Sequence, residues 1–312
     1  MKIAVFGAGA VGGYFGGRLA QAGEDIIFIA RGKHLQAMKS EGLKIDSING
    51  DFIVQPVQAT DSSADVGIVD MVLVAVKAWQ VSDAAEAMKP MIGPESFVLP
   101  LQNGVEAPSQ LSEALGEQHV LGGLCGLISY IVEPGHIRHA GTYPFIRFGE
   151  LDNSTSDRVQ KLCNVFEGTH GIKASIPSDI HVAMWQKFLL IASWSGMGAI
   201  TRAPIGIFRS QPGTRRMLGQ SLNEIYHVAK AREINLPEDA VDKTMQILDS
   251  LVPEGTASMQ RDIMDGKPSE LETQTGAVVR LGQEAGIKTP VNDFIYNSLL
   301  LMEKRARGHL NF

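Results

Sequence analysis

A glycine-rich turn near the amino terminus constrains this chain more than any other feature. An apolar run over residues 2–6 leads directly into Gly7, Ala8, Gly9, Ala10, Val11 and Gly12. Three glycines at this spacing, between a strand and a helix, are typical of the dinucleotide-binding turn of a Rossmann fold. The first permits a tight turn, the second lets the backbone approach a pyrophosphate, and the third lets the helix pack on the strand. We therefore predict that these six residues bind a dinucleotide at the positive end of the helix.

The residue that follows the second predicted strand indicates which dinucleotide binds. An NAD site usually has an acidic residue about 20 positions after the glycines, where it hydrogen-bonds the ribose 2′-hydroxyl. This chain has Arg31 there. A guanidinium can hold a 2′-phosphate through two hydrogen bonds, and Lys33 or His34 could add positive charge. The sequence thus predicts NADP(H), and the alternative is that Arg31 is a solvated loop charge.

The first half of the chain reads as alternating strands and helices. Strands are predicted over residues 2–6, 25–30 and 70–76, and their apolar, β-branched character is typical of a parallel sheet covered on both faces. Two antiparallel hairpins are also expected. One covers residues 43–54 and turns at Asn49-Gly50, and the other covers residues 127–148 and turns at Glu133-Pro134-Gly135.

Helical periodicity replaces this pattern beyond Pro177. Ser178 can cap an apolar helix that runs toward Trp194. Further helices are expected over residues 216–232, 237–251, 270–284 and 291–307. We therefore predict a nucleotide-binding domain over residues 1–178 and a helical domain over residues 179–312.

Composition excludes several classes of function. The chain has 312 residues and a net charge of −6, with dispersed Lys and Arg, so nucleic acid is not an expected partner. Its two cysteines, Cys125 and Cys163, form no metal-binding or redox pair and are read as buried thiols. The amino terminus runs straight into the glycine turn, and no apolar run approaches the roughly 18 residues of a membrane span. We expect a cytoplasmic protein with no membrane partner.

A single lysine interrupts a long apolar segment. Residues 180–201 contain one formal charge, Lys187, which shares the apolar face of its helix with Ile191 and Trp194. Burying an ammonium is costly unless it is paired, and burial lowers the pKa of a lysine. Lys187 is therefore a candidate proton donor. The alternative is a lysine whose ammonium reaches solvent at the edge of the domain.

Several motifs, together with the glycine turn, resemble the ketopantoate reductases, also called 2-dehydropantoate 2-reductases. They follow one another along almost the whole chain: Lys77-Ala78-Trp79-Gln80, Gln102-Asn103-Gly104-Val105, Trp185-Gln186-Lys187, Ser258-Met259-Gln260-Arg261-Asp262 and Glu270. The resemblance implies an α/β fold with an N-terminal Rossmann-type doubly wound sheet. It also implies a C-terminal all-α domain like that of 6-phosphogluconate dehydrogenase.

The resemblance implies an activity and a role for individual residues. In that family, NADPH reduces 2-dehydropantoate to pantoate for pantothenate and coenzyme A synthesis. Lys187 matches the general acid, and Asn103 matches the catalytic asparagine that orients it and contacts the cofactor. Lys77 matches a cofactor-side lysine, Ser258 a ligand of the substrate carboxylate, and Glu270 the acid that receives the substrate hydroxyl. We expect Asn103 to come from the first domain, and Lys187, Ser258 and Glu270 to come from the second. The site should then lie in a cleft between the two domains.

Each assignment has a structural alternative. Asn103 could form only a turn, Lys77 could be a solvated strand end, and Ser258 could be an ordinary helix hydroxyl. Glu270 could be a first-turn acid that favours the helix dipole.

The chain also departs from the family pattern. Many ketopantoate reductases have substrate-binding asparagines one and two turns after the lysine, where this chain has Ile191 and Ser195. A further asparagine is replaced near Ile205. The reaction class survives these changes, but the substrate stays open between 2-dehydropantoate and a bulkier or more apolar 2-oxo acid. A non-catalytic NADPH-binding sensor is the third reading, and a homodimer is one option for assembly.

Overall fold

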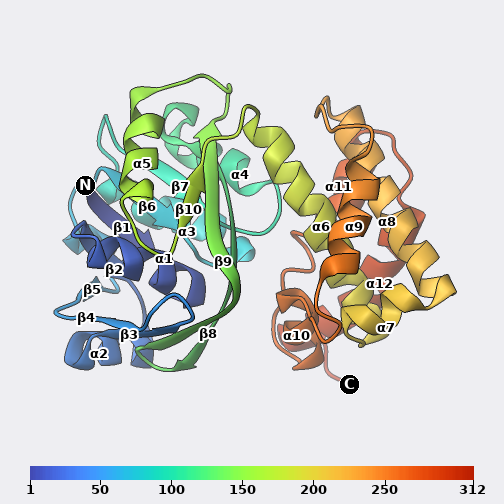
Figure 1. Cartoon of the computed structure of the whole chain (residues 1–312), viewed down its shortest axis with the longest axis horizontal. Helices are drawn as coiled ribbons and strands as arrows, with labels where there is room; N and C mark the ends of the chain where they lie inside the picture. The colour runs from blue at the N-terminus through green and yellow to red at the C-terminus, as the bar shows by residue number, and fades with distance from the viewer. The chain divides into compact units, whose positions relative to one another are not determined.

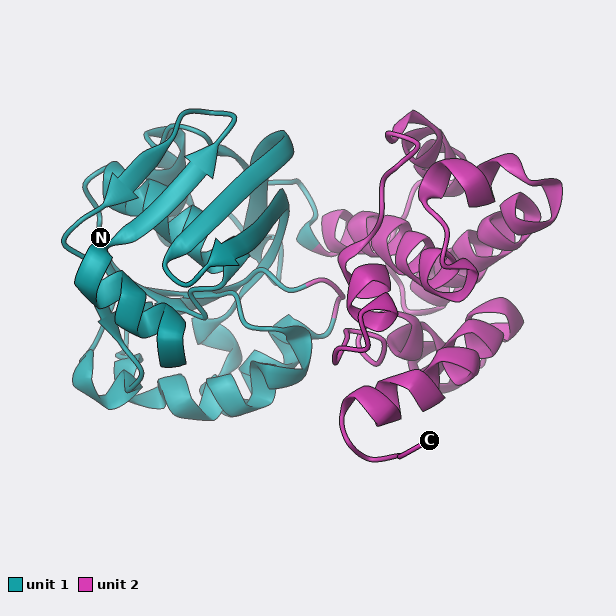
Figure 2. Ribbon diagram, turned by 90° about the horizontal axis from the view of Figure 1, so that it is seen from below, with its two compact units in different colours: residues 1–102, 106–180 teal, residues 103–105, 181–312 magenta.

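A computed structural model describes residues 1–312. The chain folds as two separate units, coloured in Figure 2. Unit 1 comprises residues 1–102 and 106–180, and unit 2 comprises residues 103–105 and 181–312. All strands lie in unit 1, and unit 2 contains helices and loops (Figure 1). No helix combines the length and apolar character that crossing a membrane would require.

The central sheet of unit 1 has five parallel strands. Their spatial order is β5 (Gln58–Thr60), β2 (Asp25–Ile29), β1 (Lys2–Phe6), β6 (Met71–Val74) and β7 (Phe97–Pro100). Every residue of β6 and β7 is buried, as expected for strands covered on both faces. This order confirms the predicted Rossmann-type doubly wound sheet, and it adds β5 and β7 to the strands predicted from the sequence.

A second sheet of unit 1 contains both predicted hairpins. Its strands are β3 (Leu43–Ser47), β4 (Phe52–Val54), β8 (Leu121–Glu133), β9 (His136–Glu150) and β10 (Lys173–Ser175). The antiparallel pairs β3/β4 and β8/β9 turn at the predicted places, where Gly50 and Gly135 have positive φ angles of 97° and 76°. The β8/β9 hairpin is longer than predicted.

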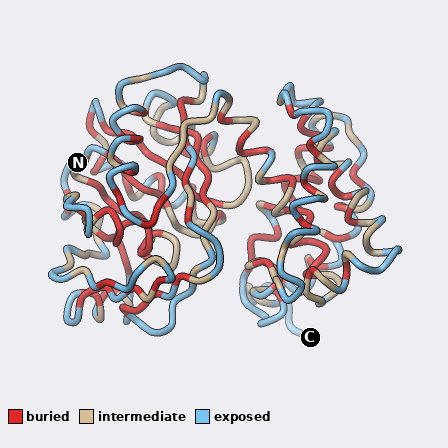
Figure 3. The backbone as a smooth tube through the Cα atoms, viewed as in Figure 1, coloured by how far each residue is buried: buried red, intermediate tan, exposed pale blue.

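Helices cover the sheets of unit 1, and buried residues concentrate along its strands (Figure 3). The α-helices are α1 (Ala10–Gln21), α2 (Gly32–Glu41), α3 (Val81–Met88), α4 (Ala107–Leu115) and α5 (Asp157–Glu167). Short 3₁₀ turns are η1 (Ser63–Asp65), η2 (Ala78–Gln80), η3 (Lys89–Met91) and η4 (Glu117–His119). One hydrophobic core includes Phe15 and Leu19 of α1 together with strands of both sheets, and a second lies under α3 and α4.

A buried arginine ties α1 to the second sheet. Arg18 is 2% exposed, and one of its amino groups donates to Ser47 Oγ at 3.1 Å and to the Gly50 carbonyl at 2.9 Å. Its guanidinium also lies 4.2 Å from the centre of the Phe52 ring. These contacts hold the β3/β4 hairpin against the helix that follows the glycine turn.

Unit 2 is a bundle of helices around its own apolar core. The helices are α6 (Ile180–Thr201), α7 (Ile205–Ser210), α8 (Pro212–Ala231), α9 (Ala240–Ser250), α10 (Ser258–Met264), α11 (Thr275–Glu284) and α12 (Pro290–Ala306). The first residue of α6 belongs to unit 1. Phe188, Leu222 and Ile295, from three of these helices, are almost fully buried. This architecture confirms the predicted all-α C-terminal region.

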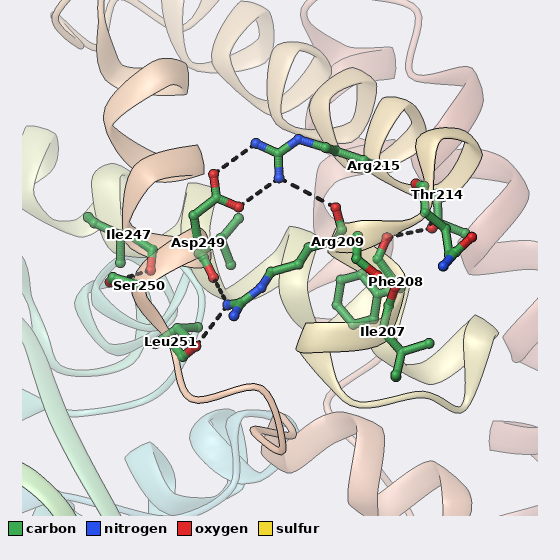
Figure 4. A network of polar contacts seen from close by, with 12 residues as sticks. Ile207, Phe208, Arg209, Thr214, Arg215, Ile247, Asp249, Ser250 and Leu251 are labelled. Carbon is green, nitrogen blue, oxygen red and sulfur yellow. Dashed lines mark hydrogen bonds and ion pairs between the residues drawn. The ribbon is translucent and has the colours of Figure 1, made fainter.

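Two arginines join α7, α8 and α9 (Figure 4). Arg215 of α8 forms a bidentate ion pair with Asp249 of α9, with N–O distances of 2.6 and 2.8 Å. Arg209 of α7 donates to the carbonyl oxygens of Leu248 and Leu251 at 2.6 and 2.8 Å. Arg209 thereby satisfies carbonyls that the end of α9 leaves without a helical partner.

The ends of two helices differ from the sequence prediction. The first amide of α6, at Ile180, donates to Asn153 Oδ1 at 2.9 Å, so Asn153 and not Ser178 provides this side-chain cap. Residues 270–274 form a turn, and α11 begins only at Thr275. Glu270 is therefore not a residue of the first helical turn. The short helices α7 and α10 were not predicted.

Candidate functional site

The glycine turn of unit 1 has the geometry that a dinucleotide site requires. Gly7 has a φ of +98°, and a Cβ added there would lie 2.8 Å from the Val76 amide nitrogen. A Cβ at Gly12 would overlap the Gly7 carbonyl oxygen. A Cβ at Gly9 would meet no atom within 4 Å. Thus Gly7 and Gly12 are required by the fold itself, whereas the space at Gly9 is open to a ligand.

The end of β2 brings Arg31 next to this turn. The Ile29 carbonyl accepts hydrogen bonds from the amides of Gly7 and Ala8, both at 3.1 Å. Arg31 follows two residues later as the N-cap residue of α2, whose first turn contains no acid. Its side chain is exposed and has no hydrogen bond or ion pair. The guanidinium and the positive helix end therefore form a cationic surface beside the turn.

His34 does not add charge to this surface, contrary to one sequence expectation. Its Nδ1 accepts a hydrogen bond from the Gly135 amide at 3.0 Å, which requires the neutral ring. Burial lowers the pKa of His34, and a contact with the Ala8 carbonyl opposes this only in part. Lys33 is exposed and stays available as a second cation.

Lys77 and Gln102 lie just beyond the carboxyl ends of β6 and β7. Lys77 is half-buried, and its ammonium lies 5.7 Å from the centre of the Trp79 ring. The buried Gln102 donates from Nε2 to the carbonyls of Val74 and Val76, at 2.9 and 3.0 Å. Gln102 thus joins the ends of two parallel strands, at the edge of an open α/β sheet where ligands bind.

The three predicted residues of α6 differ in their exposure. Lys187 and Ile191 are half-buried, and the Lys187 ammonium makes no hydrogen bond or ion pair. Ser195 is fully buried, and its hydroxyl has no partner. The adjacent Trp194 is half-buried, and its indole nitrogen is also buried without a partner. On this helix, Lys187 and Ile191 are accessible within unit 2, whereas Ser195 is not.

A hydrogen bond joins two of the predicted site residues in unit 2. Asn103 Nδ2 donates to Glu270 Oε2 at 3.4 Å, and Glu270 is 5% exposed. The neighbouring Gly104 makes this approach possible, because it has a φ of +111° and a Cβ there would lie 2.9 Å from the Thr273 carbonyl oxygen. Residues 103–105 therefore pack on the turn that carries Glu270, and Asn103 groups with unit 2.

The remaining predicted residue, Ser258, begins α10. It is half-buried, and its side chain makes no hydrogen bond. Neither Ser258 nor Lys187 is hydrogen-bonded to Asn103 or Glu270 in this structure. Sequence reasoning gave no role to Gln274, which is fully buried and donates to Glu270 Oε2 at 3.2 Å. The sequence feature that could have indicated this contact is the position of Gln274, four residues after Glu270.

Comparison with known proteins gives matches to both halves of the chain. Residues 3–153 match the family described as ketopantoate reductase PanE/ApbA, and residues 179–303 match its C-terminal region. An uncharacterized oxidoreductase of Bacillus subtilis is 30% identical, with 97% of this chain and 99% of that protein covered. A 2-dehydropantoate 2-reductase of a Nostoc species is 29% identical, with 98% of this chain and 96% of that protein covered.

Solved structures show the same fold. A PanE/ApbA family ketopantoate reductase from Ralstonia eutropha has a TM-score of 0.90 at 32% identity, with 98% of this chain and 100% of that chain covered. A D-mandelate dehydrogenase solved with NADH and anilino(oxo)acetate has a TM-score of 0.89 at 22% identity, with 98% and 99% covered. The second likeness concerns the fold alone.

Proposed function

Because the chain belongs to the ketopantoate reductase family, we propose that it reduces 2-dehydropantoate to pantoate with NADPH. The observation that carries this proposal is the Asn103–Glu270 hydrogen bond in the unit that also contains Lys187. It brings a strand-end amide and a buried carboxylate together, although 167 positions separate them in the sequence. These are the residues that match the family's catalytic asparagine and its hydroxyl-binding acid.

The residues of unit 1 fit a phosphorylated dinucleotide. The open space at Gly9 suits a pyrophosphate, and the unpaired Arg31 suits the 2′-phosphate that distinguishes NADPH from NADH. When bound, the nicotinamide supplies a hydride. Lys77, just beyond β6, would contact the same cofactor. An NADH-dependent enzyme is the alternative, since a protein of the same fold has been solved with NADH.

Lys187 would complete the reaction as general acid. Hydride addition to the ketone carbon leaves an electron pair and a negative charge on the oxygen. A lysine ammonium stabilises that charge as it develops and then transfers a proton to form the alcohol. The neutral amine regains its proton from solvent. Lys187 is suited to this role because no hydrogen bond or ion pair occupies its ammonium.

Substrate recognition would rest on Ser258 and Glu270. The free Ser258 hydroxyl can donate a hydrogen bond to the substrate carboxylate, and the Glu270 carboxylate can accept a hydrogen bond from the substrate hydroxyl. One specific observation favours a second candidate substrate. Ile191 is accessible one turn after Lys187, and an apolar side chain there suits a bulkier 2-oxo acid.

Turnover with a panel of 2-oxo acids tests the proposal. NADPH oxidation is followed by absorbance with 2-dehydropantoate and with branched and aromatic 2-oxo acids. The highest kcat/KM is expected with 2-dehydropantoate. A clear preference for an acid without a hydroxyl would favour the second candidate, and no turnover with any acid would favour an NADPH-binding sensor.

A further inference from the structure

The turn that carries Glu270 is fixed by a second carboxylate. The Ser269 amide donates to both oxygens of Glu303, at 3.1 Å each, and the Ser269 hydroxyl donates to Glu303 Oε2 at 2.5 Å. Ser269 and Glu303 are both buried, and Arg307 donates to Glu303 and to the Ser269 carbonyl. The backbone immediately before Glu270 is therefore held by α12. Because the backbone is fixed there, the orientation of the Glu270 side chain is set by the contacts that its carboxylate makes.

Two amide groups contact the same oxygen of that side chain. Asn103 Nδ2 and Gln274 Nε2 lie 3.4 and 3.2 Å from Glu270 Oε2. Asn103 lies on the loop that follows β7, whereas Gln274 ends the turn that begins at Glu270, so the donors come from different segments. Two donors on one oxygen limit rotation of the carboxylate.

The Gln274 side chain lowers the stability of the fold. It is fully buried, and its only side-chain hydrogen bond is the one to Glu270. Its Oε1 is buried without any partner. A buried unsatisfied polar group costs about 1–3 kcal/mol, which an apolar side chain of similar size would avoid. Packing and stability therefore do not explain why an amide occupies this position, whereas the contact with Glu270 does.

We propose that Gln274 is a positioning residue that turns the Glu270 carboxylate toward the hydroxyl group of the substrate. The inference rests on the proposed function, in which Glu270 receives that hydroxyl. Selectivity for hydroxylated over non-hydroxylated 2-oxo acids would then depend on a residue that does not itself touch the substrate. Selectivity of this kind is large when a buried polar group would otherwise lose its partner.

The test compares Gln274→Met with the wild type on two substrates. These are 2-dehydropantoate and 3,3-dimethyl-2-oxobutanoate, which has the same carbon skeleton but no hydroxyl. The ratio of their kcat/KM values should fall about 10-fold or more in the variant, the scale of one hydrogen bond to a charged group. The loss should appear with 2-dehydropantoate only, mainly as a higher KM. The melting temperature should stay within about 3 °C, because a lost donor is offset by a removed unsatisfied oxygen.

Thr244→Val is the matched control. Thr244 is also buried in unit 2 and donates to the Ala240 carbonyl at 2.7 Å, within α9. This variant removes a buried side-chain hydrogen bond that does not involve Glu270, and its substrate ratio should equal that of the wild type. An unchanged ratio in Gln274→Met, or an equal loss with both substrates, would overturn the inference.

A wild-type chain that does not reduce 2-dehydropantoate would contradict the proposed function instead. The crystal structure of Gln274→Met then decides the inference by itself. A Glu270 carboxylate that has rotated away from Asn103 supports the positioning role, and one that keeps its orientation overturns it.

Discussion

Arg31 is exposed beside the glycine turn and has no partner within the protein. Replacing it with Asp should weaken NADPH binding by about 2–3 kcal/mol, because a charge-assisted hydrogen-bonded pair is lost and a repulsive charge is introduced. NADH, which lacks the 2′-phosphate, should be affected less. Dissociation constants from fluorescence titration measure both effects. A wild type that binds NADH as tightly as NADPH would show that Arg31 does not select the cofactor.

Substitutions at Gly9 and Gly12 distinguish the requirements of the fold from those of ligand binding within the same turn. Gly9→Ala places a methyl group where no protein atom lies within 4 Å, so thermal stability should be almost unchanged while NADPH affinity falls at least about 10-fold. Gly12→Ala would overlap the Gly7 carbonyl oxygen and should lower the melting temperature. Calorimetry and titration of both variants provide the comparison. Unchanged NADPH affinity in Gly9→Ala would place the cofactor elsewhere.

Some residue roles were beyond sequence reasoning because distant contacts determine them. His34 follows Arg31 closely and reads as a further cation, but the Gly135 amide, 101 positions away, keeps its ring neutral. Gln274 reads as an ordinary helix residue until its hydrogen bond to Glu270 is seen. By contrast, the spacing of Gly7, Gly9 and Gly12 was sufficient to predict the turn, although the constraint at Gly7 comes partly from Val76, which is distant in the sequence.

Elements with local signals were predicted well. The hairpins at Asn49-Gly50 and Pro134-Gly135 were found because their turns require residues that tolerate positive φ. The helices α7 and α10 were missed because six and seven residues are too short to show a helical period. The start of α6 was assigned to the wrong cap because Asn153 reaches it from 27 positions earlier.

The contact between α1 and the second sheet should make folding stability sensitive to acid. His139 is 1% exposed; its Nε2 donates to the Thr142 carbonyl, so its Nδ1 accepts from Ser47. Burial lowers the pKa of His139, the Thr142 carbonyl partly opposes this, and the nearby Arg18 guanidinium lowers the pKa further. Protonation of His139 at Nδ1 would remove the acceptor of the Ser47 hydrogen bond. It would also place a second positive charge near the Arg18 guanidinium.

The folded state therefore binds the His139 proton less readily than the unfolded state does. The stabilisation is complete above the ordinary histidine pKa of about 6.5 and is lost as pH falls through the lower folded value. The free energy of unfolding should decrease from about pH 7.5 to about pH 5, and His139→Gln should reduce that decrease. Urea denaturation of the wild type and the variant at a series of pH values measures this change in the free energy of unfolding. The same pH dependence in the variant would exclude His139 as a source.

At the scale of the whole molecule, the order of motifs along the chain predicted the family, although no single motif could. The family matches cover both halves, and the chain spans nearly the full length of its relatives. Substrate identity was not predictable in the same way. At Ile191 and Ser195, this chain differs from the pattern of many family members.

In the proposed mechanism, unit 1 binds NADPH while Lys187 of unit 2 supplies the proton. Lys187→Met keeps the length and apolar stem of the side chain and removes its charge, so it separates chemistry from packing. The kcat for 2-oxo acid reduction should fall by roughly 100-fold or more, the scale of losing a general acid, whereas NADPH affinity and melting temperature should change little.

The decisive measurement is the single-turnover rate of NADPH oxidation by Lys187→Met and by the wild type, at saturating cofactor and substrate. A folded, NADPH-binding variant with almost no hydride transfer is expected. Near-normal turnover in that variant would show that Lys187 is structural and would contradict the proposed mechanism.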